Sequence, residues 1–306
     1  MNYIAVCVMT HEHPDTVEQV LENCAAAYRA CELDMYYYDS SSDDRTAEII
    51  AAYNEAGYDN IHHLCFRGLS GDQKLAQLYL GTGLEKDYEY IWVVKDRSVC
   101  DAVALLLIYK EIMFEKPDLL VIDTYSDKRL GRSVSYADPA ELYRDYAWEI
   151  TSMDVTVFGR RMLEGFVPNE EPWPLSDPRS SFMQYDLVFR RLSELEAPKI
   201  RVISNDDVRI LNSTKSGSMW VRQIFDVWVR LWTRENEGLP GIYEPYKETV
   251  MKSSAVPDLL KSVEGLNELR NKGILTEAVI DDELLERWEK VSDIPASVLV
   301  ECAGKV

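Results

Sequence analysis

The sequence predicts an α/β protein in which helices flank a mostly parallel sheet, followed by a helical C-terminal region. Over the first 123 residues, short apolar segments alternate with amphipathic ones, the pattern of consecutive βα units. Residues 90–94 are apolar without interruption, as expected of a strand buried on both faces. From about Met219 onward only helical periodicity remains. We therefore divide the chain into an α/β domain, 1–216, and a helical C-terminal region, 217–306.

Each element follows from its periodicity and from the residues that interrupt it. Alternating and β-branched residues predict strands, apolar residues at helical spacing predict helices, and Gly, Pro, Asn and Asp separate them. The predicted strands are 3–9, 33–38, 61–66, 90–94, 119–123, 155–158 and 200–203. The predicted helices are 16–30, 46–53, 73–80, 99–114, 139–150, 183–195, 220–232, 256–269 and 283–291. Residues 125–135 and 167–179 are polar or proline-rich and predict irregular connections.

Composition narrows the classes of partner. The chain has 306 residues, with 33 basic against 53 acidic side chains and a net charge of -20. Nucleic acids and anionic membranes need a cationic surface, so we expect neither as a partner. No apolar run reaches the ~18 residues of a membrane span, so no stable membrane insertion is expected. Six cysteines without a CxxC pair indicate reduced thiols, and the first residues predict a strand rather than a signal peptide. We expect a cytoplasmic protein.

The most informative stretch is 37–46, which joins a predicted strand to a predicted helix. Ligands in open α/β sheets lie outside the carboxyl ends of the strands. Asp39 stands at such an end, followed by hydroxyls and carboxylates. Helix capping would explain Ser42 or Asp44. It does not explain Asp39, which predicts a ligand-binding role for that carboxylate.

Three stretches resemble the family-2 glycosyltransferases of the GT-A fold. In 6–14, Thr10, His11 and His13 stand at the threonine, aromatic and arginine positions of that family's first turn. In 39–46, Asp39 and Thr46 match the family's aspartate-rich loop in register, together with Ser42 and Asp44, while Ser40 departs from it. Residues 90–98 lie where the family has a strand ending in its DxD metal motif. The resemblance covers roughly residues 3–220.

The resemblance implies a GT-A fold and a nucleotide-sugar donor. It assigns the uridine of a UDP-sugar to Thr10, His11 and Asp39, with Ser41 beside them. It implies a glycan, a glycoprotein or a lipid-linked molecule as acceptor, and inversion at the anomeric carbon. The late loop over the pyrophosphate corresponds to 215–220, so Lys215 and Trp220 are further donor-binding candidates. The histidines also admit a plainer interpretation as exposed turn residues.

The metal motif is where this chain departs from the family. Lys95 and Arg97 flank a single carboxylate, Asp96. Hard divalent cations prefer several anionic oxygens, so this is a poor site for Mn²⁺ or Mg²⁺. If a metal binds, Asp96 is its ligand. We hypothesise instead that Lys95 and Arg97, helped by Lys74 or Lys215, neutralise the diphosphate directly. The alternative is an ion-paired surface turn that caps the next helix.

The general base is also displaced. Met183 and Gln184 stand where the family carries its acidic pair, and neither can take a proton. We favour Asp177 as the base. The alternatives are Asp186, Glu170 and Glu171.

The sequence therefore predicts a UDP-sugar-dependent glycosyltransferase that builds a surface glycan of bacterial type or glycosylates a protein. Two alternatives remain open: a non-catalytic nucleotide-binding module, and a sugar-phosphate nucleotidyltransferase. The absence of glycine from 10–14 counts against the second alternative. Trp228 and Trp232 in the C-terminal region predict a helix that packs on the α/β domain or on a second copy, giving a homodimer.

Overall fold

The computed structural model describes residues 4–84, 86–100, 102–123, 133–165, 182–204, 208–210, 221–253 and 256–304. Contacts divide the chain into two compact units. The first is drawn from 1–139, 149–178 and 194–212, and the second from 140–148, 179–193 and 213–306. The predicted boundary at 216 falls outside the described residues and stays a prediction.

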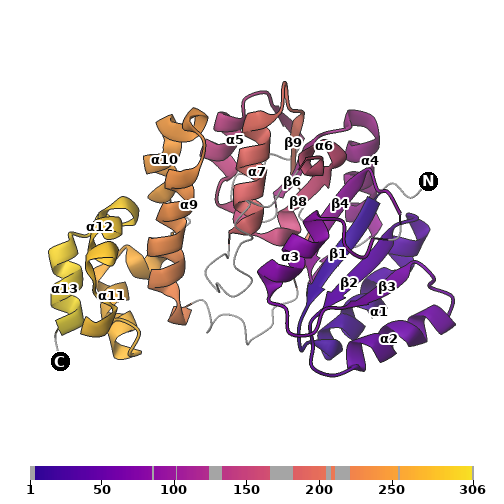
Figure 1. Cartoon of the computed structure of the whole chain (residues 1–306), viewed down its shortest axis with the longest axis horizontal. Coiled ribbons are helices and arrows are strands. Elements are labelled where there is room, and N and C mark those ends of the chain that lie inside the picture. The colour runs from indigo at the N-terminus through magenta and orange to yellow at the C-terminus, as the bar shows by residue number, and fades with distance from the viewer. Residues whose placement is uncertain are drawn as a thin grey trace. The chain divides into compact units, whose positions relative to one another are not determined.

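The first unit is built on a mixed, mostly parallel sheet, and the α/β prediction is confirmed (Figure 1). Within the described residues the main sheet has eight strands in the order β3-β2-β1-β4-β8-β6-β9-β7. Strands β8 and β7 run antiparallel to their neighbours, and the remaining pairs are parallel. The strands are β1 Ile4–Thr10, β2 Asp34–Asp39, β3 Ile61–Cys65, β4 Tyr90–Lys95, β6 Leu119–Asp123, β7 Val134–Tyr136, β8 Thr156–Gly159 and β9 Ile200–Ser204.

Helices cover both faces of this sheet. Buried side chains of α1 and α4 pack with alternate residues of β1, β2 and β4 in one apolar core. Helix α3 contacts β1 and turns Leu75 and Leu78 into the interior. The helices of this unit are α1 Pro14–Ala30, α2 Arg45–Glu55, α3 Gly71–Tyr79, α4 Ala102–Glu115 and α6 Arg160–Leu163, with 3-10 turns at Glu149–Thr151 and Met153–Val155.

A second, two-stranded sheet was not predicted. Strand β5, Ser98–Cys100, pairs antiparallel with β10, Val208–Ile210. The sequence analysis assigned residues 99 and 100 to the following helix, which begins at Ala102 instead. A three-residue strand is held by a partner far along the chain, so local periodicity carries no signal for it.

The parallel register places the predicted site at one edge of the sheet. Strand β1 pairs with β2 so that Thr10 lies opposite Asp39, and with β4 so that Met9 lies opposite Lys95. Because β1, β2 and β4 run in the same direction, their carboxyl ends meet at the same edge. The three strand ends predicted to bind the donor are therefore adjacent.

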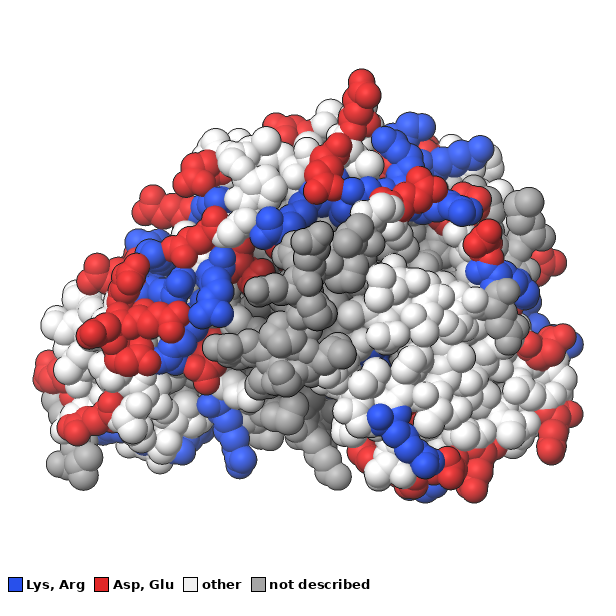
Figure 2. Space-filling view, in the orientation of Figure 1, with Lys and Arg blue, Asp and Glu red and all other residues white. Residues whose placement is uncertain are grey.

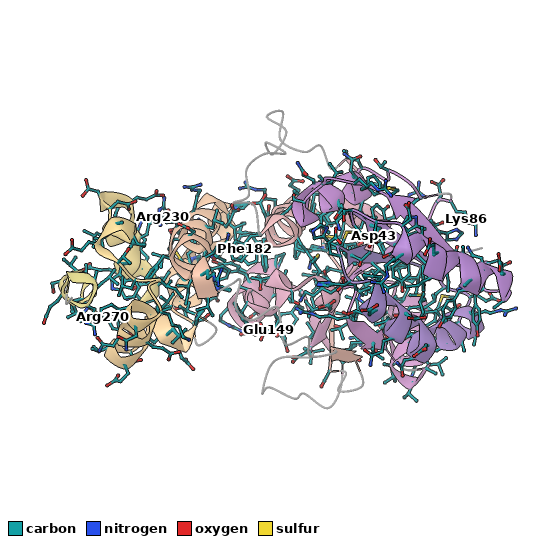
Figure 3. All side chains as sticks on the ribbon, turned by 90° about the horizontal axis from the view of Figure 1, so that it is seen from below. Asp43, Lys86, Glu149, Phe182, Arg230 and Arg270 are labelled. Carbon is teal, nitrogen blue, oxygen red and sulfur yellow. The ribbon has the colours of Figure 1, made fainter. Side chains whose placement is uncertain are left out.

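The second unit is helical around an aromatic core. Phe182, labelled in Figure 3, packs against Trp228 and Trp232 with ring centroids 5.7 and 5.6 Å apart. Tyr143 and Tyr185 both donate hydrogen bonds to the side-chain oxygen of Asn236, at 2.5 and 2.7 Å. The elements are α5 Pro139–Tyr146, α7 Met183–Glu194, a π-helical stretch Asp226–Leu231, α9 Trp232–Gly238, α10 Glu244–Met251, α11 Val263–Asn271, α12 Asp282–Val291 and α13 Ala296–Gly304, with 3-10 turns at Gly241–Tyr243, Asp258–Leu260 and Glu277–Val279.

Alternating ion pairs hold the outer helices of this unit together. Acidic and basic side chains are interspersed over these helices (Figure 2). Arg230 bonds Asp226 and Asp281, while Arg287 bonds Glu237 and Glu283. The negative charge is therefore partly compensated here by local pairs. Among the described helices none is long and apolar enough to cross a membrane.

Candidate functional site

Asp39 is a buried carboxylate at the end of β2, and donors surround it. The backbone N–H and the hydroxyl of Ser41 donate to Oδ1 at 2.8 and 2.6 Å. His63 Nε2 lies 3.0 Å from Oδ2. Burial acts to raise the pKa of Asp39, but the hydrogen bonds from His63 and Ser41 outweigh it and leave the pKa lowered. Asp39 is therefore held ionised, although only 3% of its surface is exposed.

The loops after β1 and β2 are fastened to each other around Asp39. The backbone N–H of Glu12 donates to the Ser41 hydroxyl at 2.8 Å, and a Glu12 carboxylate oxygen accepts from the N–H of Ser42 at 2.7 Å. His11 Nδ1 lies 3.2 Å from the carbonyl oxygen of Ser40. Glu12 adopts the left-handed backbone conformation, φ 57°, which is costly for a residue with a side chain. The Ser41 hydroxyl thus links the two loops, because it donates to Asp39 and accepts from Glu12.

Lys74 lies on α3, on the face of the sheet opposite to α1, and its side chain extends to the edge where Thr10 and Asp39 lie. A capping box between Ser70 and Gln73 begins α3, and Lys74 lies one turn into it. The ammonium group donates to the carbonyl oxygen of Thr10. The residue is 2% exposed, and burial lowers its pKa to about 8 against Asp39 and Asp96, which act to raise it. A buried cation thus lies close enough to both strand-end aspartates to feel their charge.

Asp96 follows β4 on the other side of β1. Its Oδ2 accepts from the Thr10 hydroxyl at 3.1 Å and lies 2.9 Å from His13 Nδ1. The residue is 8% exposed, while about half of the His13 side chain is exposed. The structure therefore brings together Thr10, Asp96 and His13 from two predicted stretches.

Lys95 is paired with Asp154, a partner that was not predicted from the sequence. Its ammonium group lies 3.0 Å from Asp154 Oδ2 and 2.7 Å from the hydroxyl of Ser152. Its backbone N–H donates to Asp154 Oδ1 at 2.7 Å. Lys95 is therefore shared with a carboxylate of the protein itself.

The described residues at this edge do not fit a divalent cation. Across the described parts of the chain, no group of three or more His, Cys, Asp or Glu side chains could hold a metal ion. Asp96 Oδ2 already has Thr10 and His13 as partners, and the residues on either side of Asp96 are cationic. Hard cations require several free anionic oxygens, which this arrangement does not supply.

Several predicted residues lie outside the described residues. They are Asp177, Lys215, Trp220, Glu170 and Glu171. Asp186 is described: it lies in the second unit, on α7, and bonds Arg190 at 2.6 Å. Met183 and Gln184 begin the same helix and are buried.

Sequence reasoning missed His63 and Asp154. His63 lies in β3 and reaches Asp39 across the sheet, while Asp154 lies in the 3-10 turn before β8. The available signals were a histidine pair inside an apolar strand and an aspartate directly before another strand. Neither signal identifies a partner.

A cavity of about 560 Å³ lies at the other end of β4, away from all of these residues. Tyr88 and Ile91 line it together with Phe158 and Arg160. Both basic residues described in its lining are paired, Arg160 with Glu164 at 3.2 Å and Lys86 with Asp34 at 3.0 Å. Strand-end geometry, not cavity size, identifies the candidate site.

Comparison with known proteins rests on structure alone. No protein-family model matches the sequence, and no curated protein matches it. Residues 1–349 of TarS from S. aureus superpose with a TM-score of 0.58 at 14% identity, covering 99% of this chain and 81% of that chain. The fold is that of the GT-A glycosyltransferases.

Two further structures support this GT-A fold. TarS in complex with UDP-GlcNAc gives a TM-score of 0.55 at 14% identity, over 90% of this chain and 82% of that chain. The mannosyltransferase PcManGT from Pyrobaculum calidifontis, in complex with GDP-Man and Mn²⁺, gives 0.54 at 15% identity, over 99% and 86%. The predicted GT-A fold is therefore confirmed.

Proposed function

We propose that this protein is a glycosyltransferase that takes a sugar from a UDP-sugar and passes it to a glycan, glycoprotein or lipid-linked acceptor. The observation that carries the proposal is Asp39, an ionised and buried carboxylate at the carboxyl end of β2 in a GT-A fold. The edge of uracil that pairs with other bases presents an N–H group, which a carboxylate accepts. Structures with this fold include complexes with UDP-GlcNAc and with GDP-Man.

Asp39 also limits which bases fit. Uracil and guanine both present a ring N–H to an acceptor, whereas cytosine and adenine present a bare ring nitrogen. The carboxylate therefore favours UDP or GDP over CDP and ADP. We choose UDP because the resemblance of the first turn and of 39–46 is to uridine-binding loops.

The diphosphate is held in this proposal by the protein's own cations, without a divalent metal. Arg97 and Lys95 flank Asp96, and Lys74 lies beneath Thr10. Fixed cations at a leaving diphosphate stabilise its developing charge. Asp154 shares the Lys95 ammonium. In the proposal Arg97, Lys95 and Lys74 act together on the diphosphate, with Lys215 and Trp220 from the late loop.

Acceptor activation remains the least constrained step. We retain Asp177 as the general base, as a substitute for the family's acidic pair. Inversion as the stereochemical outcome is carried by the family resemblance. A cytoplasmic location and a homodimer through the C-terminal helices are part of the same proposal. The substitution of the acidic pair by Met183 and Gln184 favours one alternative, a nucleotide-binding protein without transferase activity.

Calorimetric titration with UDP, GDP, CDP and ADP tests the proposal, in EDTA and again with Mn²⁺. We expect UDP to bind in EDTA, and Asp39→Asn to weaken binding by roughly 100-fold, since an amide can present its N–H₂ to the base N–H. Asp43→Asn in the same loop is the matched control, because Asp43, labelled in Figure 3, is exposed and accepts from the backbone N–H of Arg45 in that loop.

Release of UDP from UDP-GlcNAc, UDP-glucose and UDP-galactose then separates enzyme from binding protein. Binding without turnover, across a panel of acceptors, would favour the non-catalytic alternative. Absence of UDP binding under both metal conditions would refute the UDP-sugar proposal. Binding that requires Mn²⁺ would refute its metal-free part.

A further inference from the structure

Asp154 is a fully buried charge with no role in the proposed chemistry so far. It is 0% exposed and lies in the 3-10 turn Met153–Val155, just before β8. An isolated carboxylate would not persist in such a place, because the loss of hydration costs several kcal/mol. Its partners therefore show what it is retained for.

Apart from Ser152, whose hydroxyl lies 3.4 Å from Oδ2 of Asp154, the partners come from β4 and from the start of β5, on either side of the turn that joins them. Oδ1 accepts from the backbone N–H of Lys95 at 2.7 Å and from the hydroxyl of Ser98 at 2.5 Å. Oδ2 pairs with the Lys95 ammonium at 3.0 Å. The carbonyl oxygen of Asp154 accepts from the indole N–H of Trp92 at 2.9 Å. Asp154 thus bonds Trp92 and Lys95 of β4 and Ser98, the first residue of β5.

We infer that Asp154 is a positioning residue of the donor site. The turn it closes is Lys95 to Ser98, and Asp96 lies inside that turn. With both ends of the turn fixed, the Asp96 carboxylate is held toward Thr10 and His13. The Asp154 carboxylate also pairs with the Lys95 ammonium. This pairing determines how strongly the Lys95 charge can act on a bound diphosphate.

The inference rests on the proposed function for its ligand, and it supplies what a metal-free site requires. A bridging cation would otherwise tie the turn to the diphosphate and fix both. Here an internal carboxylate from a segment 59 residues away fixes the turn before any ligand arrives. Preorganisation of this kind avoids ordering the turn at the moment of binding.

A matched pair of variants isolates the hydrogen bonds from the charge. Both are made on a Lys95→Met background, so that neutralising Asp154 does not leave the partly buried Lys95 ammonium without its counter-charge. Asp154→Asn keeps an oxygen that accepts from the turn, and Asp154→Leu has similar volume without an acceptor. The two proteins carry the same charge and differ only in the acceptor.

The readouts are the dissociation constant for UDP, by calorimetry, and amide hydrogen exchange across 92–100. The two variants are compared with each other, because Lys95→Met alone leaves the buried Asp154 carboxylate without its counter-charge. We expect the Leu variant to bind UDP at least tenfold more weakly than the Asn variant and to exchange at least tenfold faster at 95–98, as for the loss of a hydrogen bond to a charged or dipolar partner. Equal affinity and equal exchange in the two variants would overturn the inference.

Three further outcomes are covered by these proteins and one additional variant. If Asp154→Leu does not fold, Asp154→Ala in the same background leaves room for water and gives the same comparison. If Lys95→Met itself loses UDP, exchange at 95–98 decides, because it needs no ligand. Wild-type protein that fails to bind UDP refutes the proposed function separately, since exchange still reports whether Asp154 holds the turn.

Discussion

The two units treat buried carboxyl groups in opposite ways. In the first unit, hydrogen bonds from His63 and Ser41 keep the pKa of Asp39 below its ordinary value in spite of burial. In the second, burial raises the pKa of Asp186, although Arg190 acts against it, and raises the pKa of Glu235 to about 7. Asp39 and Asp186 are the same residue type, 3% and 7% exposed, while Glu235 is partly buried. The surrounding donors decide the outcome.

This contrast distinguishes the sheet edge that carries Asp39, which we call the binding edge, from the aromatic core of the second unit. Hydrogen-bond donors are concentrated at the strand ends, where backbone N–H groups are exposed and histidine and serine side chains converge on Asp39. In the second unit burial outweighs the attraction of Arg190, so the pKa values of Asp186 and Glu235 are raised. A carboxylate that must accept a ligand N–H belongs to the first environment. Asp39 therefore fits a role in binding the sugar donor better than Asp186 or Glu235 does.

Lys74 gives the largest expected effect, because it is the buried cation of the binding edge. Burial lowers its pKa to about 8 from 10.5, so the folded protein binds fewer protons than the unfolded chain between those values. Stability from this group should rise with pH across that interval, by roughly 3 kcal/mol. In Lys74→Met that rise should be absent, and UDP should bind roughly tenfold more weakly.

Chemical denaturation of both proteins at pH 7, 8, 9 and 10 measures this difference. Tyrosine and cysteine groups titrate in both proteins and cancel in the comparison. Parallel stability curves for wild type and Lys74→Met would contradict a lowered pKa. Unchanged UDP affinity would remove Lys74 from the donor site while leaving its electrostatics intact.

How much of this the sequence could predict depends on the range of each interaction. The strand ends at Thr10 and Asp39 were predicted, because alternation and apolar runs are local signals and parallel strands share an edge. Helices α10 and α13 were missed, since each is short and its apolar stripe is weak. The partners His63 and Asp154 could not be predicted. His63 contacts Asp39 from a neighbouring strand, and Asp154 contacts the turn after β4 from a distant segment of the chain. The pairing of strands is not encoded in a local stretch of sequence.

Glu235 gives the next effect, in the opposite direction to Lys74. Burial raises its pKa from 4.5 to about 7, with the negative charge of Asp186 acting in the same sense. The folded state then binds more protons than the unfolded chain between these values, so stability falls as pH rises through that window. Glu235→Gln should remove the fall and gain on the order of 1 kcal/mol at pH 8 relative to wild type.

Thermal unfolding at pH 5 and pH 8 suffices for this test. The melting temperature of the variant should exceed that of wild type at pH 8 and approach it at pH 5. UDP affinity should not distinguish the two proteins, since Glu235 is not among the residues proposed to bind the sugar donor. A larger stability gap at pH 5 than at pH 8 would reverse the assignment of the two environments.

Ser41→Ala is the smallest change and reports on Asp39 directly. It removes the hydroxyl that donates to Oδ1 at 2.6 Å and leaves the backbone N–H of residue 41 in place. Because the folded pKa of Asp39 is lowered, its stabilisation is present above the unfolded value of 3.8 and is lost as pH falls through the folded pKa. The variant should be less stable than wild type by about 1 kcal/mol at pH 6. That gap should narrow below pH 3.8, where protonation of Asp39 removes the charge that the hydroxyl stabilises, and a gap that stays constant down to pH 3 would show that Ser41 acts only by fastening the loop to Glu12.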